Sequence, residues 1–60
     1  SEKAAGELNR FLLSIIANTE GTEKEYFSQL LENVQKQDLT PELYADTFAK
    51  IFTRAISEIH

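Results

Sequence analysis

The sequence predicts an all-α protein, a small antiparallel three-helix bundle made of an αα-hairpin and a third helix. Apolar residues recur at helical spacing in three blocks, and short polar segments separate these blocks. No stretch alternates between apolar and polar residues with the period of two that a β-strand would show. With 60 residues the chain has room for one domain, so residues 1–60 are expected to form a single helical domain.

The first helix is expected at about residues 3–18. Leu13 lies off its apolar face, and the polar run that follows contains Gly21, whose freedom to adopt a positive φ angle favours a helix end there. The apolar residues at positions i, i+3, i+4, i+7 and i+8 line one face of this helix: Ala4, Leu8, Phe11, Leu12, Ile15 and Ile16.

The second helix is expected at about residues 23–37. Thr22 and Glu25 have the spacing of a capping box, in which a hydroxyl and a carboxylate each bind a free backbone N–H at the helix start. The helix is expected to end within residues 35–38, which contain no apolar side chain to continue its stripe. That stripe consists of Tyr26, Phe27, Leu30, Leu31 and Val34.

The third helix is expected at residues 41–59. Thr40 is a typical N-cap and Pro41 a typical first helical residue, while Leu39 and Tyr44 occupy the positions of a hydrophobic staple. The apolar stripe is about 140° wide if each residue turns by about 100°, which is broad for a helix that covers one neighbour. It consists of Tyr44, Phe48, Ile51, Phe52, Ala55, Ile56 and Ile59.

Together the three stripes predict a core of twelve residues. Burial of one large apolar side chain contributes roughly 1.5 to 3 kcal/mol, so a core of this size barely offsets the conformational entropy of the chain. The predicted core is Leu8, Phe11, Leu12, Ile15, Phe27, Leu30, Leu31, Val34, Phe48, Ile51, Ala55 and Ile59.

The charge pattern disfavours nucleic acids and anionic membranes as partners. Ten acidic residues outnumber six basic ones, for a net charge of −4, and no apolar run is long enough to span a bilayer. Nearly every basic residue has an acidic residue at helical spacing, which leaves little basic surface unpaired. The expected pairs are Lys3 with Glu7, Arg10 with Glu7, Lys36 with Glu32, Lys50 with Asp46, and Arg54 with Glu58.

No residue pattern predicts catalysis, a metal ion or another cofactor. Cysteine is absent, and the single histidine, His60, is the last residue, so neither a nucleophile with its base nor a thiolate or imidazole metal site is expected. Two groups of carboxylates are instead typical of acidic residues near helix N-termini: Glu20, Glu23 and Glu25, and the pair Glu42 and Asp46. We therefore expect a protein that is not an enzyme.

Several large apolar residues lie at or beyond the edges of their stripes, which is typical either of the exposed apolar area of any small domain or of a surface that binds a partner. The broad third stripe favours the second interpretation. A tyrosine at a stripe edge buries its ring and keeps its hydroxyl in water, as interface residues often do. We expect a partner-binding surface formed by Leu13, Tyr26, Tyr44, Phe52 and Ile56.

Three segments carry a resemblance to a known family. The segments Arg10–Ile16, Phe27–Leu31 and Leu39–Tyr44 resemble the F-L-x-x-L helix and the L-T-x-E-x-[FY] junction of the TAF-homology, or nervy-homology, domain. The resemblance covers residues 10–52. It implies a small helical hub of a transcriptional coregulator that binds short amphipathic motifs in an apolar groove. The loop after the first helix is shorter here, and the family's proline-rich segment is absent.

Two classes of function remain open, and a third has less support. The first is an interaction module that accepts an amphipathic and basic helix or linear motif of another protein in an apolar groove between helices. The second is a docking or dimerisation element, such as a modular-synthase docking domain, whose stripe packs on its own copy or on a sister subunit. The third is a helical piece of a DNA-modifying enzyme. The chain begins with Ser1, which favours a domain excised from a longer protein, and no feature identifies a compartment.

Overall fold

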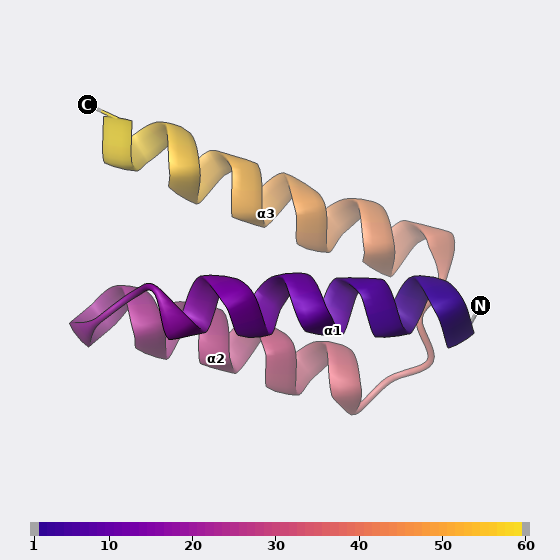
Figure 1. Cartoon of the computed structure of the whole chain (residues 1–60). Coiled ribbons are helices and arrows are strands. Elements are labelled where there is room, and N and C mark those ends of the chain that lie inside the picture. The colour runs from indigo at the N-terminus through magenta and orange to yellow at the C-terminus, as the bar shows by residue number, and fades with distance from the viewer. Residues whose placement is uncertain (1, 60) are drawn as a thin grey trace.

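The computed structural model describes residues 2–59, and the side chains of residues 2–57. In this part of the chain there are three helices and no strands: α1 (Glu2–Ala17), α2 (Gly21–Gln35) and α3 (Pro41–Ile59). The chain reverses direction at each connection, so that α1 and α3 run the same way and α2 runs opposite to both (Figure 1). The predicted all-α, three-helix fold is confirmed, and the predicted helix ends agree within two residues.

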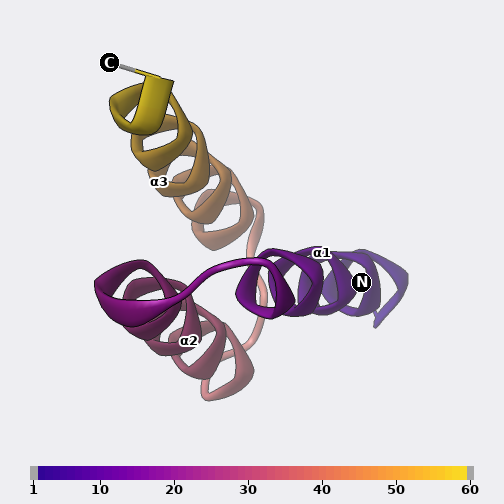
Figure 2. The ribbon, with the colours of Figure 1, turned by 60° about the vertical axis from the view of Figure 1, so that its left-hand side comes forward.

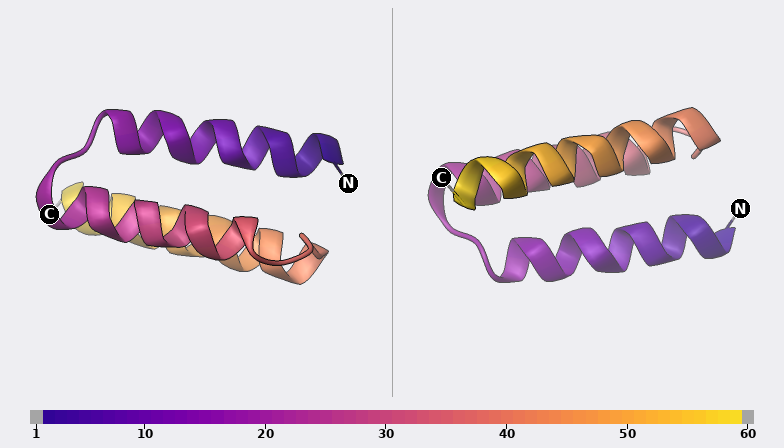
Figure 3. Two further views of the ribbon diagram at one scale, coloured as in Figure 1. Left: turned by 90° about the horizontal axis from the view of Figure 1, so that it is seen from below. Right: turned by 90° about the horizontal axis from the view of Figure 1, so that it is seen from above.

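The core lies mainly in the hairpin of α1 and α2. Leu8 and Leu12 of α1 are almost fully buried, and α3 contributes Ile51 to the same cluster. The axes of the three helices follow the long dimension of the molecule (Figure 3). However, α3 diverges from the hairpin toward its C-terminal end (Figure 2). The remaining members of the cluster all come from α2: Phe27, Leu30, Leu31 and Val34.

The predicted core is correct for the residues at the centre of each stripe and wrong at two edges. Phe11 is 42% exposed and Ala55 is also exposed, because both lie where α3 diverges from α1. Ile15 and Phe48 are partly buried against the cluster, and the side chain of Ile59 lies outside the described residues.

Thr47 belongs to the buried interior although its side chain is polar. It is 1% exposed, and its hydroxyl donates a hydrogen bond of 2.7 Å to the carbonyl of Leu43, one turn earlier. Since the hydroxyl is satisfied within its own helix, burial carries little penalty.

The α1–α2 connection differs from the prediction. α2 begins at Gly21, whose φ angle is +62°, and the preceding residue Glu20 forms no side-chain cap. Thr22 therefore lies inside the first turn, and the predicted capping box with Glu25 is wrong. The positive φ predicted for Gly21 is confirmed, but it occurs at the start of α2, four residues beyond the end of α1.

The α2–α3 connection agrees with the prediction. The Thr40 hydroxyl accepts a hydrogen bond of 3.1 Å from the backbone N–H of Leu43, which is the N-cap interaction. Pro41 is the first helical residue. Leu39 and Tyr44, the two staple positions, both pack against the core cluster. This junction fixes the N-terminal end of α3 against the hairpin.

The accessible surface of the molecule is larger than that of a typical compact protein of the same mass. Its accessible surface is 4437 Å², whereas a compact protein of 6.8 kDa is expected to expose roughly 4,000 Å². The exposed large apolar side chains come from α1 and α3: Phe11, Leu13, Phe52 and Ile56. The two longest apolar stripes are thus only partly covered by the chain itself.

Candidate binding groove between α1 and α3

An apolar groove opens between the C-terminal halves of α1 and α3, over the start of α2. Its volume is about 340 Å³, within the range of about 300–1,000 Å³ typical of ligand pockets. We call it the α1–α3 groove. Its lining consists of Phe11 and Ile15 of α1, Thr19 of the α1–α2 connection, Glu23 and Phe27 of α2, and Ile51, Phe52, Arg54 and Ala55 of α3.

The width of the α3 stripe accounts for this groove. Ile51 points into the bundle and is 4% exposed, whereas Phe52, turned by about 100° from it, is 60% exposed. The ribbon of α3 diverges from that of α1 (Figure 2), and Phe52 on this second half of the stripe stays mostly exposed. The apolar width predicted from the sequence is therefore present as an uncovered face.

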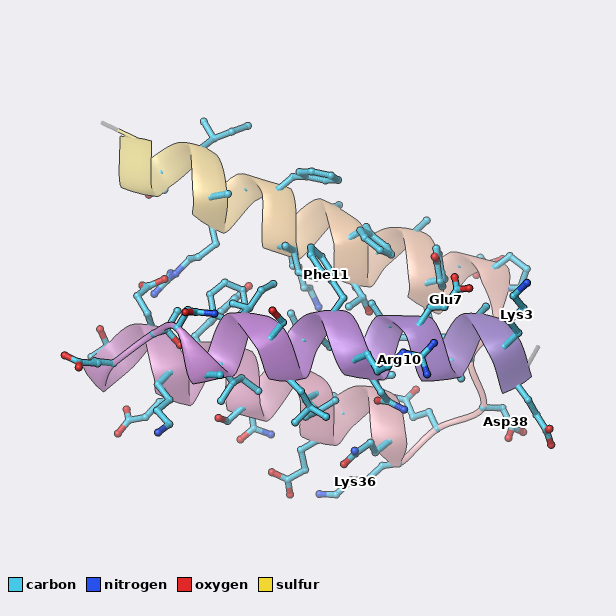
Figure 4. The ribbon with its side chains drawn as sticks, viewed as in Figure 1. Lys3, Glu7, Arg10, Phe11, Lys36 and Asp38 are labelled. Carbon is cyan, nitrogen blue, oxygen red and sulfur yellow. The ribbon has the colours of Figure 1, made fainter. Side chains whose placement is uncertain are left out.

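Aromatic rings form a row along the same face. The ring centroids of Tyr44 and Phe48 lie 4.9 Å apart, and those of Phe48 and Phe52 lie 6.2 Å apart. Phe11 of α1 stacks on Phe48 at 5.7 Å and points from α1 toward α3 (Figure 4). Pairs at these separations are worth about 0.5–1.5 kcal/mol beyond their burial, so the Phe11–Phe48 pair stabilises the contact between α1 and α3.

Arg54 joins α3 to α2 at one end of the groove. Its Nη2 lies 2.8 Å from Glu23 Oε1, and its Nε donates to both carboxylate oxygens, at 2.9 Å and 3.2 Å. Its guanidinium carbon also lies 4.4 Å from the centre of the Tyr26 ring. Planar guanidinium groups favour both kinds of contact. The ion pair between Arg54 and Glu23 therefore borders this end of the groove.

Sequence reasoning did not identify this ion pair. Glu23 lies 31 residues before Arg54, and only the tertiary arrangement brings them together. The predicted partner of Arg54 was Glu58, whose side chain lies outside the described residues. The sequence held one indirect signal, since Arg54 follows Ile51 by three residues and so lies near the buried side of α3.

The five residues predicted to bind a partner do not form one surface. Phe52 lines the α1–α3 groove. Tyr26 is half-buried beneath Arg54, and Tyr44 lies at the other end of α3, beside a smaller cavity of about 180 Å³. Ile56 is 58% exposed, one turn beyond Phe52, and Leu13 is 52% exposed on a part of α1 outside the groove. Phe11 and Phe27, which the prediction assigned to the core, line the groove as well.

Exposed ion pairs lie on the outer faces of the helices. Lys36 pairs with Glu32 and Lys50 with Asp46, each at 3.0 Å, as predicted. The Asp46 carboxylate accepts a hydrogen bond from Lys50 and raises the pKa of that lysine. Glu7 lies on the side of α1 toward α3, near the N-terminal half of α3 (Figure 4). One turn before Phe11, it adds an acidic group to this face.

A second and larger cavity lies beside the α2–α3 connection and is lined by polar and apolar residues alike. Its volume is about 440 Å³, and its lining includes Glu2, Gln35, Gln37 and Asp38. Asn9 also lines it, and the side-chain oxygen of Asn9 is buried without a hydrogen-bond partner among the described residues. Since amphipathic helices bind through apolar contacts, the α1–α3 groove is the better candidate for such a ligand.

The described residues offer neither a metal site nor a membrane span. No three histidine, aspartate or glutamate side chains there are grouped so that they could hold a metal ion. None of the helices in residues 2–59 combines the length and apolar character needed to cross a membrane.

Comparison with protein-family models, curated proteins and solved structures gave no match. The resemblance to the TAF-homology domain therefore stays a prediction.

Proposed function

We propose that this protein is a non-enzymatic interaction module whose α1–α3 groove binds an amphipathic helix or short linear motif of another protein. Such a module serves within a multiprotein assembly, of the transcriptional kind if the TAF-homology resemblance holds. The observation that carries the proposal is the apolar groove itself, with Phe11 (42% exposed) and Phe52 (60% exposed) on its two sides.

Apolar burial supplies the affinity in this proposal. Phe27 and Ile51 are buried residues that line the groove, while Phe11 and Phe52 are the lining residues that a ligand would newly cover. Large aromatic side chains of this kind dominate the energetics of protein interfaces. A helix that places residues i, i+3, i+4 and i+7 on one face presents a stripe suited to such a groove.

Charge supplies the selectivity. The chain carries a net charge of −4, and Glu7 lies on the α3 side of α1, one turn before Phe11. Arg54, the basic residue that lines the groove, is paired with Glu23. A basic amphipathic helix is therefore attracted to this face, and an acidic one is repelled.

The proposal is tested with two synthetic helical peptides that share one apolar face of leucines and carry either lysine or glutamate on the polar face. Titration into the ¹⁵N-labelled protein is expected to shift the amides near Phe11, Ile15 and Phe52 with the lysine peptide. The glutamate peptide is expected to shift them far less. Added salt is expected to weaken binding of the lysine peptide, because it screens the attraction.

Two variants distinguish binding in the groove from nonspecific hydrophobic binding. Phe52→Ser removes an exposed side chain of the groove, and Leu13→Ser removes one of similar exposure outside it. Only Phe52→Ser is expected to weaken the shifts strongly at a given peptide concentration. Shifts spread evenly over the three helices, or equal effects of both variants, would contradict binding in the groove.

A further inference from the structure

The outer face of α3 carries a second apolar row beside the groove. Its members are separated by four, three and four residues, and all of them are exposed, with Phe52 and Ile56 more than half so. We call it the outer row. It consists of Ala45, Ala49, Phe52 and Ile56. The row turns away from Thr47 and Ile51, the two α3 residues that are buried in the bundle.

Charged residues are absent from this row. Asp46, Lys50 and Arg54 follow one another at intervals of four and occupy a separate strip of α3, and Glu42 borders the N-terminal end of the row, three residues before Ala45. Asp46 and Lys50 pair with each other at 3.0 Å, and Arg54 is engaged with α2. The outer row is therefore an uncharged strip about three turns long.

The spacing of the row is that of a helix that packs along another helix. Alternating steps of four and three residues keep apolar side chains on the seam between two helices that pack at a shallow angle. The inward residues of α3 already pack on the hairpin, so the outer row is a second seam on the same helix.

The sizes of the four side chains indicate the partner. Alanines occupy the N-terminal half of the row, and the large Phe52 and Ile56 occupy the C-terminal half. In an antiparallel pair of α3 helices, Ala49 of one copy faces Phe52 of the other, and Ala45 faces Ile56. Each contact then joins a small and a large side chain, which fills space evenly. A parallel pair would place large on large at one end and alanine on alanine at the other.

We infer that a second copy of this chain packs on the outer row, with the two α3 helices antiparallel about a two-fold axis between residues 50 and 51. Such an isologous contact uses the same strip on both copies. It does not depend on the proposed ligand of the α1–α3 groove. Phe52 borders both surfaces, but Ile15 and Phe27 lie on the groove side alone.

The area that the outer row can bury limits the affinity of one copy for the other. A stable interface buries about 800 Å² per partner, which is nearly a fifth of the 4437 Å² that this chain exposes. One strip of a single helix provides less, so the pairing depends on protein concentration. The two copies also repel each other through their net charges of −4. Salt screens this repulsion and strengthens the pairing, whereas it weakens binding of a basic peptide.

Cysteine cross-linking tests the geometry, because the chain contains no cysteine. In the antiparallel pair, residues 45 of the two copies lie about 16 Å apart along the helix axis, since eleven residues rise by about 1.5 Å each. A disulfide needs Cα atoms within about 7 Å. A mixture of Ala45→Cys and Ile56→Cys proteins under a mild oxidant is expected to form the mixed disulfide in preference to either symmetric one. Symmetric disulfides at residue 45 in equal or larger amount would overturn the inference.

Hydrodynamic mass tests the pairing itself in the unmodified chain. Light scattering is expected to show a mass that rises from 6.8 kDa toward twice that value at millimolar protein, and rises further with added salt. Ala49→Glu places a charge in the outer row and is expected to hold the mass at 6.8 kDa, while Leu13→Glu on α1 is expected to leave the rise unchanged. A mass of 6.8 kDa at every concentration and salt level would overturn the inference and leave the groove proposal standing.

Discussion

Alanine substitutions at Ile51 and Phe52 compare how much the covered and the uncovered half of the α3 stripe contribute to the free energy of unfolding. Phe52 is 60% exposed and Ile51 is 4% exposed. Full burial of a large apolar side chain is worth about 1.5–3 kcal/mol, so the two fifths of Phe52 that are covered correspond to about 0.6–1.2 kcal/mol. Alanine favours the helix over phenylalanine by up to about 0.5 kcal/mol, which offsets part of this loss.

We therefore expect Phe52→Ala to lower the free energy of unfolding by less than about 1 kcal/mol. Ile51→Ala removes a buried side chain and leaves a cavity, which typically costs about 2–5 kcal/mol. A single core in a domain this small supplies roughly 3–5 kcal/mol in total. Ile51→Ala is thus expected to remove most of the stability, although Ile51 has the smaller side chain of the two.

Urea unfolding followed by circular dichroism measures both losses. Thermal unfolding is expected to give the same order, with a shift of about 4–8 °C for each kcal/mol in a domain of this size. Equal losses for the two variants would refute the reasoning, because Phe52 would then have to be packed in the core as firmly as Ile51.

Three further predictions concern the helix ends and the ion pair at the groove. Thr40→Ala removes the N-cap of α3 and is expected to cost about 1 kcal/mol, whereas Thr22→Ala, which removes no cap, is expected to cost only a few tenths, as measured by thermal unfolding. Gly21→Ala places a Cβ atom at a φ of +62° and is expected to cost about 1–2 kcal/mol in urea unfolding, although no neighbouring atom obstructs it. A double-mutant cycle with Glu23→Gln and Arg54→Met is expected to give a coupling of about 0.5–1 kcal/mol, because both side chains are partly exposed to solvent.

Distinct outcomes would contradict each of these three. Equal costs for the two threonine variants would indicate that Thr22 caps α2 in solution, in contrast to the structure. A stabilising effect of Gly21→Ala would mean that the connection does not require a left-handed residue. Additive effects of the two ion-pair variants would show that Glu23 and Arg54 do not interact in solution.

The local signals in the sequence predict most of the fold. Thr40 and Pro41 place the start of α3 at the observed residue, because capping depends only on neighbours along the chain. Thr22 carries the same kind of capping signal, but the prediction that it caps α2 is wrong. Gly21, one residue earlier, adopts a positive φ and starts α2 before the threonine can cap it.

The groove lies beyond what helix periodicity can predict. The stripe on α3 indicates which residues are apolar and how wide the face is, but not how far α1 extends over it. Periodicity therefore places Phe11 in the core, whereas the divergence of α3 leaves it 42% exposed (Figure 2). The contact between Glu23 and Arg54 likewise joins residues distant in the sequence, and no spacing rule connects them.

In the function that we propose, the uncovered face of α3 binds another helix through the α1–α3 groove. The affinity of the lysine peptide for three proteins tests it most directly: the unmodified chain, Phe52→Ser and Leu13→Ser. Loss of a central aromatic contact typically costs about 2 kcal/mol or more, so Phe52→Ser is expected to weaken binding by at least about thirtyfold. Leu13→Ser is expected to leave the affinity unchanged. Equal affinities for all three proteins, or a larger loss at Leu13, would contradict the claim.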